Sequence, residues 1–137
     1  MVGLVIAAHG HLAEELLATA REIVGEIPAV ATCSVDPGAS AEDLKAHISA
    51  AVKAVDQGQG VLVFADLIGG SPCTQSLSLC RQTRLEVITG VNLPLLLKAN
   101  SLRHEVPTLT EFTDQLTAYG QRTITCATEL VRARLVG

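Results

Sequence analysis

The sequence predicts an α/β domain built on an open parallel sheet with helices on both faces. Three observations support this prediction. Short apolar runs that end at glycine or aspartate alternate with segments of helical periodicity. The strongest of these runs are continuously apolar, which is typical of strands covered on both faces. The 137 residues contain no repeat and no linker, so we expect a single domain over residues 1–137.

The first strand is expected near the start of the chain, where the run V-G-L-V-I-A-A leads into His9 and Gly10. An amphipathic helix is expected over residues 11–24, with glutamates in its first turn and Gly25 just past its end. These are the usual signals of a helix start and stop. His9 is therefore predicted at the carboxyl end of a strand, where ligands bind in open α/β sheets.

The second strand–helix unit begins with a strand at residues 29–35, followed by a turn at Asp36-Pro37-Gly38. A capping box at residues 40–43, of the S-x-x-D kind, starts the helix behind it. The apolar face of this helix is expected to consist of Leu44, Ile48, Val52 and Val55.

The third unit starts with a very hydrophobic strand at residues 60–65, which ends on Asp66. After two glycines, Ser71 suits a helix N-cap and Pro72 suits the first helical position, where its missing N–H costs nothing. Two residues of this helix are expected to face the core, Leu77 and Cys80.

The last part of the chain completes the sheet. A fourth strand is expected at residues 85–89, then a short helix through Lys98, and a capping box at residues 108–111 opens a helix closed by Gly120. In the tail, residues 123–128 alternate threonine with other side chains and predict an edge strand, the one antiparallel member of the sheet. With the strand order 2-1-3-4, the domain is a flavodoxin-like three-layer sandwich.

Composition excludes several classes of function. The net charge of −4 and the lack of a basic run argue against binding to nucleic acid or to an anionic membrane. Aromatic residues make up only 2%, and no apolar run is long enough to span a bilayer. No signal peptide is recognisable, so a cytoplasmic location is expected. The cysteines show no metal-ligand spacing, so we expect no metal, no cofactor and mostly buried free thiols, at Cys33, Cys73, Cys80 and Cys126.

Two residues that are distant in the sequence carry the predicted chemistry. With strands 1 and 3 adjacent, His9 and Asp66 meet at the carboxyl edge of the sheet. A carboxylate that accepts a hydrogen bond from Nδ1–H fixes the imidazole tautomer and leaves Nε2 free as a nucleophile. Glycine-rich turns at Gly10, Gly69-Gly70-Ser71 and Gly90 offer backbone N–H groups to a phosphoryl group. From the residues alone, a turn histidine and a turn-capping aspartate remain the alternatives.

A set of motifs in a fixed order strengthens the functional interpretation. The motifs are His9-Gly10 followed by L-A-E-E, Pro37-Gly38, Gly60-Val61-Leu62 before Asp66, Gly69-Gly70-Ser71-Pro72, and the run E-V-I-T-G-V-N-L-P at residues 86–94. On these motifs the chain resembles, nearly end to end, the mannose-family enzyme IIA proteins (EIIA-Man) of the phosphoenolpyruvate-dependent sugar phosphotransferase system.

The resemblance implies that His9 takes a phosphoryl group on Nε2 from the phosphohistidine of HPr and passes it to a histidine of a IIB protein. It implies that Asp66 orients His9, and that Gly10, Gly70, Ser71 and Asn92 lie around the phosphoryl group. It further implies a homodimer in which the C-terminal strand is exchanged between copies. Association with a membrane permease is expected only through partners.

Some residues depart from the family pattern. Ala8 stands where serine or threonine is common, so a hydroxyl that contacts the phosphoryl group is missing. His11, expected to face solvent, and Cys73 are also unusual for the family. The sequence ends soon after the predicted last strand, without a linker or a fused IIB domain, so a separate IIB acceptor is expected.

Three other functions fit part of the pattern. The first is a regulatory interaction module of an incomplete phosphotransferase system, whose phosphorylation state controls a kinase or a transcription factor. The second is the phosphoryl donor of a dihydroxyacetone kinase-type system. The third, a flavodoxin-like nucleotide or flavin binder, is disfavoured by the scarcity of aromatic residues and by the missing dinucleotide fingerprint.

Overall fold

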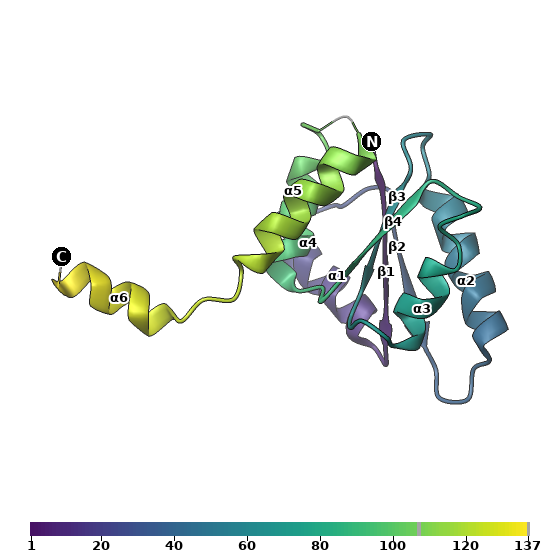
Figure 1. Cartoon of the computed structure of the whole chain (residues 1–137), viewed down its shortest axis with the longest axis horizontal. Coiled ribbons are helices and arrows are strands. Elements are labelled where there is room, and N and C mark those ends of the chain that lie inside the picture. Colours follow the sequence, from purple (N-terminus) through teal and green to yellow (C-terminus); the bar gives the residue numbers. More distant parts are fainter. Residues whose placement is uncertain (107, 137) are drawn as a thin grey trace.

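The computed structural model describes residues 1–106 and 108–136, which form four strands and six helices (Figure 1). The strands are β1 (Gly3–His9), β2 (Val30–Val35), β3 (Val61–Ala65) and β4 (Leu85–Thr89). The helices are α1 (Leu12–Val24), α2 (Ala41–Val55), α3 (Ser71–Leu77), α4 (Leu93–Leu102), α5 (Leu109–Gln121) and α6 (Ala127–Val136).

The four strands form one parallel sheet in the order β2-β1-β3-β4, which confirms the predicted order. Helices α1, α4 and α5 cover one face, and α2 and α3 cover the other (Figure 1). Alternate side chains of β1 enter the two apolar clusters, with Leu4 and Ile6 on the first face and Val5 and Ala7 on the second. Because both faces are covered, the strands are continuously apolar, as the sequence indicates.

Both predicted N-cap residues, Ser40 and Thr108, cap their helices. Ser40 Oγ accepts a hydrogen bond from the backbone N–H of Asp43 at 3.0 Å, at the start of α2. Thr108 Oγ1 accepts from the backbone N–H of Glu111 at 3.2 Å, at the start of α5. Element ends differ from the sequence prediction by a few residues. The largest difference is in α4, which ends at Leu102 and not at Lys98.

The predicted C-terminal edge strand is wrong. Residues 123–126 have no regular structure, and the chain then forms α6, which stands away from the rest of the molecule (Figure 1). Threonine and isoleucine alternate over only a few residues, whereas alanine, leucine, glutamate and arginine, all good helix formers, dominate the segment that follows. Helical bonding begins at Cys126, whose carbonyl oxygen accepts from the backbone N–H of Glu129.

The prediction for α3 is wrong in two respects. Gly70 and not Ser71 occupies the N-cap, so Pro72 is the second helical residue. The buried positions also differ from the predicted ones. Leu77 is exposed, and the buried side chains in this part of the chain are those of Pro72, Cys73, Ser76 and Leu79.

The four thiols divide equally between the core and the surface. Cys33 and Cys73 are buried, whereas Cys80 and Cys126 are exposed, and all four are free. The prediction of mostly buried thiols is therefore correct for only two of the four. Cys80 was predicted to face the core, and this prediction is wrong. Burial raises the pKa of the Cys33 thiol to about 11, so this side chain behaves as an uncharged core residue.

One buried charge joins α4 to the start of two strands. Arg103, which follows α4, is only 3% exposed. Its guanidinium donates to the backbone carbonyl oxygens of Val2 (Nε at 3.1 Å and Nη2 at 2.5 Å), Pro28 (2.5 Å) and Ala29 (3.0 Å). Burial lowers the pKa of Arg103 to about 10, so the group stays protonated at neutral pH. Backbone carbonyls therefore compensate the buried cation.

Replacing Arg103 by methionine is expected to lower the free energy of unfolding by at least about 2 kcal/mol, since buried carbonyl oxygens lose their donors. Methionine keeps most of the apolar volume, so the change isolates the hydrogen bonds. Urea denaturation of both proteins measures the effect. The control is Arg81→Met at an exposed site, where a change below about 0.5 kcal/mol is expected. Equal stability of the Arg103 variant and the wild type would contradict this role.

Candidate functional site

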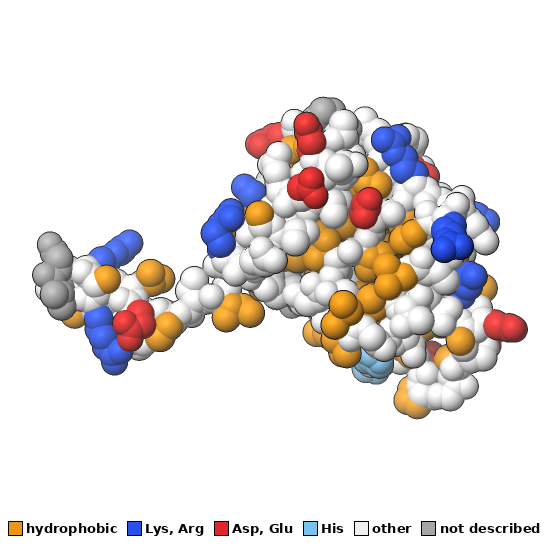
Figure 2. All heavy atoms as spheres, in the orientation of Figure 1, with side chains coloured by type: hydrophobic (Ala, Val, Ile, Leu, Met, Phe, Trp, Pro, Cys, Tyr) orange, Lys and Arg blue, Asp and Glu red, His pale blue; other side chains and the backbone are white. Residues whose placement is uncertain are grey.

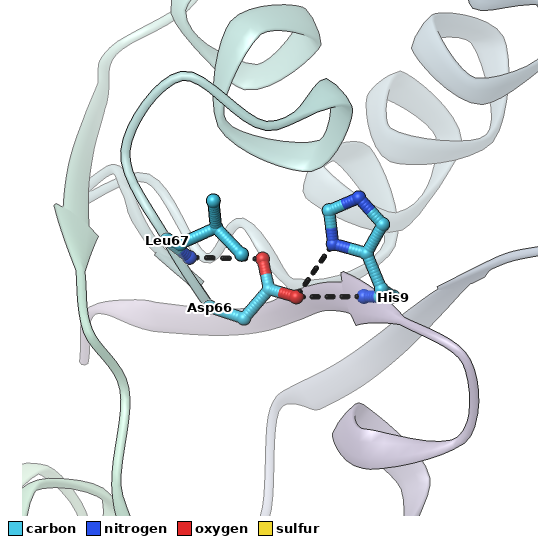
Figure 3. A network of polar contacts seen from close by, with 3 residues as sticks. All are labelled: His9, Asp66 and Leu67. Carbon is cyan, nitrogen blue, oxygen red and sulfur yellow. Dashed lines mark hydrogen bonds and ion pairs between the residues drawn. The ribbon is translucent and has the colours of Figure 1, made fainter.

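The site forms where β1 and β3 end side by side. β1 ends at His9, and Asp66 follows directly after β3. The two strands pair in parallel, with Ala7 opposite Ala65, so both residues lie at the carboxyl edge of the sheet (Figure 3). The side chain of His9 is 48% exposed, whereas that of Asp66 is 9% exposed. The structure thus brings together the two residues that the sequence singled out.

Three N–H donors hold the carboxylate of Asp66 in place. Oδ2 accepts from Nδ1 of the His9 ring at 2.7 Å and from the backbone N–H of the same residue at 2.9 Å. Oδ1 accepts from the backbone N–H of Leu67 at 2.9 Å (Figure 3). The two backbone donors were not predicted from the sequence, because they depend on the local course of the chain at the strand ends.

This hydrogen bonding determines the state of the imidazole. An ionised carboxylate only accepts hydrogen bonds, so Nδ1 carries the proton and Nε2 keeps its lone pair. The Nε2 atom points away from Asp66 (Figure 3). The arrangement therefore presents a nucleophilic nitrogen at an exposed edge of the sheet, with a negative charge behind it that stabilises positive charge on the ring.

Opposing effects act on the pKa of Asp66. Burial raises this pKa, but hydrogen bonds from the backbone and ring of His9 and from the backbone of Leu67 lower it, as does the charge of the imidazolium. The net effect is a pKa below the ordinary value of 3.8. Asp66 is therefore ionised at neutral pH, as its role as a hydrogen-bond acceptor requires.

Two of the predicted phosphoryl-binding residues lie next to His9, Gly10 in the chain and Gly70 in space, and Ser71 follows Gly70. Gly10 follows His9 and has a positive φ of 58°, which only glycine adopts without strain. Gly70 lies against the ring, because a Cβ built on it would come within 2.9 Å of His9 Cε1. Ser71 begins α3 and its side chain is exposed. Of these residues, Gly70 is therefore the one that the structure places against the ring.

Asn92 lies in a different place. It caps α4, where its Oδ1 accepts from the backbone N–H of Leu95 at 2.9 Å and its Nδ2 donates to Thr123 Oγ1 at 2.7 Å. It lines a pocket of about 340 Å³ between β4 and α5, two strands away from β1. The sequence N-L-P carries the signal for this cap, since asparagine precedes a helix start with proline near it. A role of Asn92 at the phosphoryl group stays a prediction.

The residues that depart from the family pattern have defined places. Ala8 is fully buried in the cluster beneath α1, so a hydroxyl on this side chain would lie in the core. His11 faces solvent as predicted, with Nδ1 at 3.8 Å from Glu14 Oε2, and Glu14 Oε1 accepts from Ser34 Oγ at 3.0 Å. Cys73 is 2% exposed and is therefore a core residue.

Within the described part of the chain, no group of three or more histidine, cysteine or acidic side chains is arranged to hold a metal ion. None of the helices in residues 1–106 and 108–136 combines the length and the hydropathy of a membrane span.

Known proteins resemble this chain over the region that contains the site. Residues 3–117 match the EIIA-man family, described as PTS system fructose IIA component. The mannose-specific EIIAB component of Escherichia coli (strain K12) is 36% identical over 111 residues, which make up 80% of this chain and 34% of that protein. The chain thus spans about a third of that relative's length. The fructose-specific EIIA component of Bacillus subtilis is 27% identical over 130 residues, 94% of this chain and 88% of that protein.

Solved structures share the fold. The mannose/sorbose specific IIA subunit from Enterococcus faecalis is 31% identical, with a TM-score of 0.77 over 91% of this chain and 93% of that chain. The EIIA component from Streptococcus agalactiae is 23% identical, with a TM-score of 0.87 over 94% of this chain and 99% of that chain. The region matched to the family, residues 3–117, contains all four strands together with His9 and Asp66, but not α6.

Proposed function

The chain belongs to the EIIA-man family, and on this premise we propose that it is a phosphocarrier of the sugar phosphotransferase system. The observation that carries the proposal is the 2.7 Å contact between His9 Nδ1 and Asp66 Oδ2. It leaves Nε2 unprotonated on a half-exposed ring, which is the state needed to accept a phosphoryl group. The active residue is therefore His9, and Asp66 orients it.

The transfer proceeds by direct exchange between two histidines. The lone pair of His9 Nε2 attacks the phosphorus atom of a donor phosphohistidine, so that a new N–P bond forms as the donor N–P bond breaks. The donor nitrogen leaves with the bonding electron pair, and the proton of His9 stays on Nδ1. Asp66 stabilises the positive charge that develops on the ring. When His9 passes the phosphoryl group on, the acceptor histidine is the nucleophile and Nε2 of His9 is the leaving nitrogen.

Groups around His9 are proposed to hold the phosphoryl oxygens. The backbone N–H groups of Gly10 and Gly70 and the hydroxyl of Ser71 are donors at this edge of the sheet. Asn92 is the fourth proposed contact, in line with the family resemblance, although its amide caps α4 in this structure. Phosphoryl transfer depends mainly on such positioning and charge stabilisation.

The proposed partners follow from the family. HPr is the donor, and a separate IIB protein is the acceptor. Both must bring a histidine to the carboxyl edge of the sheet, where His9 lies. Association with a membrane permease is proposed only through partners, and the cytoplasmic location remains a prediction from the sequence.

Phosphotransfer in a reconstituted mixture tests the proposal. Phosphoenolpyruvate, enzyme I, HPr and the wild-type protein are combined, and acid-labile, base-stable phosphate is expected on His9. Mass spectrometry of the intact protein and of its peptides distinguishes His9 from the other exposed histidines, His11, His47 and His104. Lack of label from an active, cognate HPr would contradict the carrier function and would favour the regulatory module.

We further propose that two copies associate through the C-terminal arm, residues 123–136. The outer edge of β4 is open within the described residues, and hydrophobic side chains gather on the face between α5 and α3 (Figure 2). The arm carries large apolar side chains into solvent, with exposed fractions of 89% at Ile124 and 81% at Leu135. Placing α6 of each copy on the apolar face of the other covers both surfaces.

Replacing Leu130 and Leu135 together by glutamate is expected to convert a dimer into a monomer, because charged residues oppose burial of this helix. Sedimentation equilibrium of the double variant and the wild type measures the mass. The control is Ala18→Glu, which adds a negative charge at an exposed position of α1 and is expected to leave the mass unchanged. A wild-type protein that is monomeric at high micromolar concentration would contradict this association.

A further inference from the structure

The backbone at Gly70 does not itself require glycine. Its φ of −76° and ψ of 162° lie in the extended region, which every residue type adopts without strain. Gly69 is different, because its φ is +82°, in the left-handed region that favours glycine. The lack of a side chain at position 70 therefore needs an explanation outside the backbone conformation.

The surroundings of Gly70 supply that explanation. A Cβ on this residue would stand 2.9 Å from Cε1 of the His9 ring and 3.4 Å from Cγ of Leu67. Carbon atoms that are not bonded pack best at about 3.5–4.0 Å. The ring would have to retreat by roughly half an ångström or more to accept a methyl group.

The ring is half exposed and can retreat toward solvent, but its hydrogen bond to Asp66 opposes that movement. Its Nδ1 is 2.7 Å from Asp66 Oδ2, and the same oxygen accepts from the backbone of His9. The other carboxylate oxygen is held by the backbone of Leu67, so Asp66 cannot follow a ring that moves. A displacement of the imidazole therefore lengthens or bends its hydrogen bond to Asp66.

From this geometry we infer that Gly70 is a positioning residue for the phosphoryl transfer, because its missing Cβ lets His9 occupy the place in which Asp66 holds it. Cε1 is bonded to both ring nitrogens, so a steric displacement of this atom also displaces the proton-bearing Nδ1 and the nucleophilic Nε2. This inference rests on the proposed carrier function and adds a steric requirement that the Asp66 contact alone does not contain.

The test compares the imidazole tautomer of His9 in the wild type and in Gly70→Ala. Long-range ¹H–¹⁵N correlation spectra of the unphosphorylated protein report which ring nitrogen carries the proton. The wild type is expected to show one tautomer, protonated at Nδ1, and the variant a mixture of both. The rate of labelling by phospho-HPr is expected to fall about tenfold to hundredfold in the variant. Thermal unfolding of both proteins checks that the fold is retained.

The matched control is Gly69→Ala, which strains the same loop but places its Cβ with no described atom within 4 Å. It is expected to keep the wild-type tautomer. A second comparison, between Leu67→Ala and Leu67→Ala/Gly70→Ala, repeats the test in a less crowded loop, should Gly70→Ala fail to fold. Here a lower Nδ1-protonated fraction is expected in the double variant.

Two outcomes would overturn the inference. One is a wild-type tautomer in both Gly70 variants, whatever their transfer rates. The other is an equal tautomer change in Gly69→Ala, which would assign the effect to general loop distortion. The spectra need no donor protein, so they decide the inference even if the wild type takes no phosphate. Failure of labelling in the wild type alone would contradict the carrier function and leave the positioning result intact.

Discussion

Replacing His9 by alanine is expected to abolish labelling by phospho-HPr. Nε2 of this residue is the proposed nucleophile, and alanine offers no atom that can form the N–P bond. The measurement is the amount of acid-labile phosphate on the variant, in the reconstituted mixture that labels the wild type. Residual labelling at the wild-type rate would mean that another histidine carries the phosphoryl group.

The fold of the His9→Ala variant is expected to survive. The side chain is 48% exposed, and its one polar contact among the described residues is with Asp66, which keeps its two backbone donors. The expected loss of stability is about 1 kcal/mol, the net worth of one hydrogen bond. His11→Ala is the matched control, because it removes a second exposed imidazole two residues away and is expected to leave labelling unchanged.

Replacing Asp66 by asparagine is expected to slow the transfer on the order of 10²-fold or more, since the imidazole loses its fixed tautomer and its stabilising charge. The geometry makes the amide a poor substitute. Both carboxylate oxygens accept from N–H groups, so either orientation of an asparagine side chain turns its NH₂ toward an N–H donor. Single-turnover labelling of the variant measures the rate. A wild-type rate would exclude the orienting role of Asp66.

The same variant has an expected signature in acid. Hydrogen bonds hold the pKa of Asp66 below its ordinary value of 3.8 in the folded protein. The carboxylate therefore contributes stability that is fully present above that ordinary value and is lost as the pH falls through the lowered pKa. Urea unfolding at pH 6 and near pH 3 is expected to show the wild type and Asp66→Asn converging in acid. A constant difference between them would show that the ionised carboxylate adds nothing to stability.

The central part of the fold could be predicted because its signals are strong and local. Continuous apolar runs identify the strands, and capping side chains such as Ser40 and Thr108 identify helix starts. The pairing of His9 with Asp66 follows from strand order, because the ends of neighbouring parallel strands lie together. For most of the chain, the apolar pattern, the helix caps and the strand order therefore all predict the structure that is observed.

The errors occur where local patterns are short or ambiguous. The segment at residues 123–128 is too brief to distinguish a strand from the approach to a helix, and the sheet does not extend to it. In α3, the seven residues cover only about two turns, too few for the apolar pattern to define the buried face, and the buried position is Ser76 and not its neighbour Leu77. The contact of Gly70 with the His9 ring has no sequence signal, because it depends on how close the loop comes to a side chain 61 positions earlier.

The separation of the two proposed active residues along the chain has a consequence for synthesis. His9 and Asp66 are 57 positions apart, and they meet only through the pairing of β1 with β3. A ribosome makes the histidine first and the carboxylate several seconds later, at roughly 5–20 residues per second. During that interval the nascent chain carries an imidazole with no fixed tautomer. The proposed phosphoryl-carrying site therefore forms together with the tertiary structure, and an unfinished chain is expected to be a poor competitor for the donor.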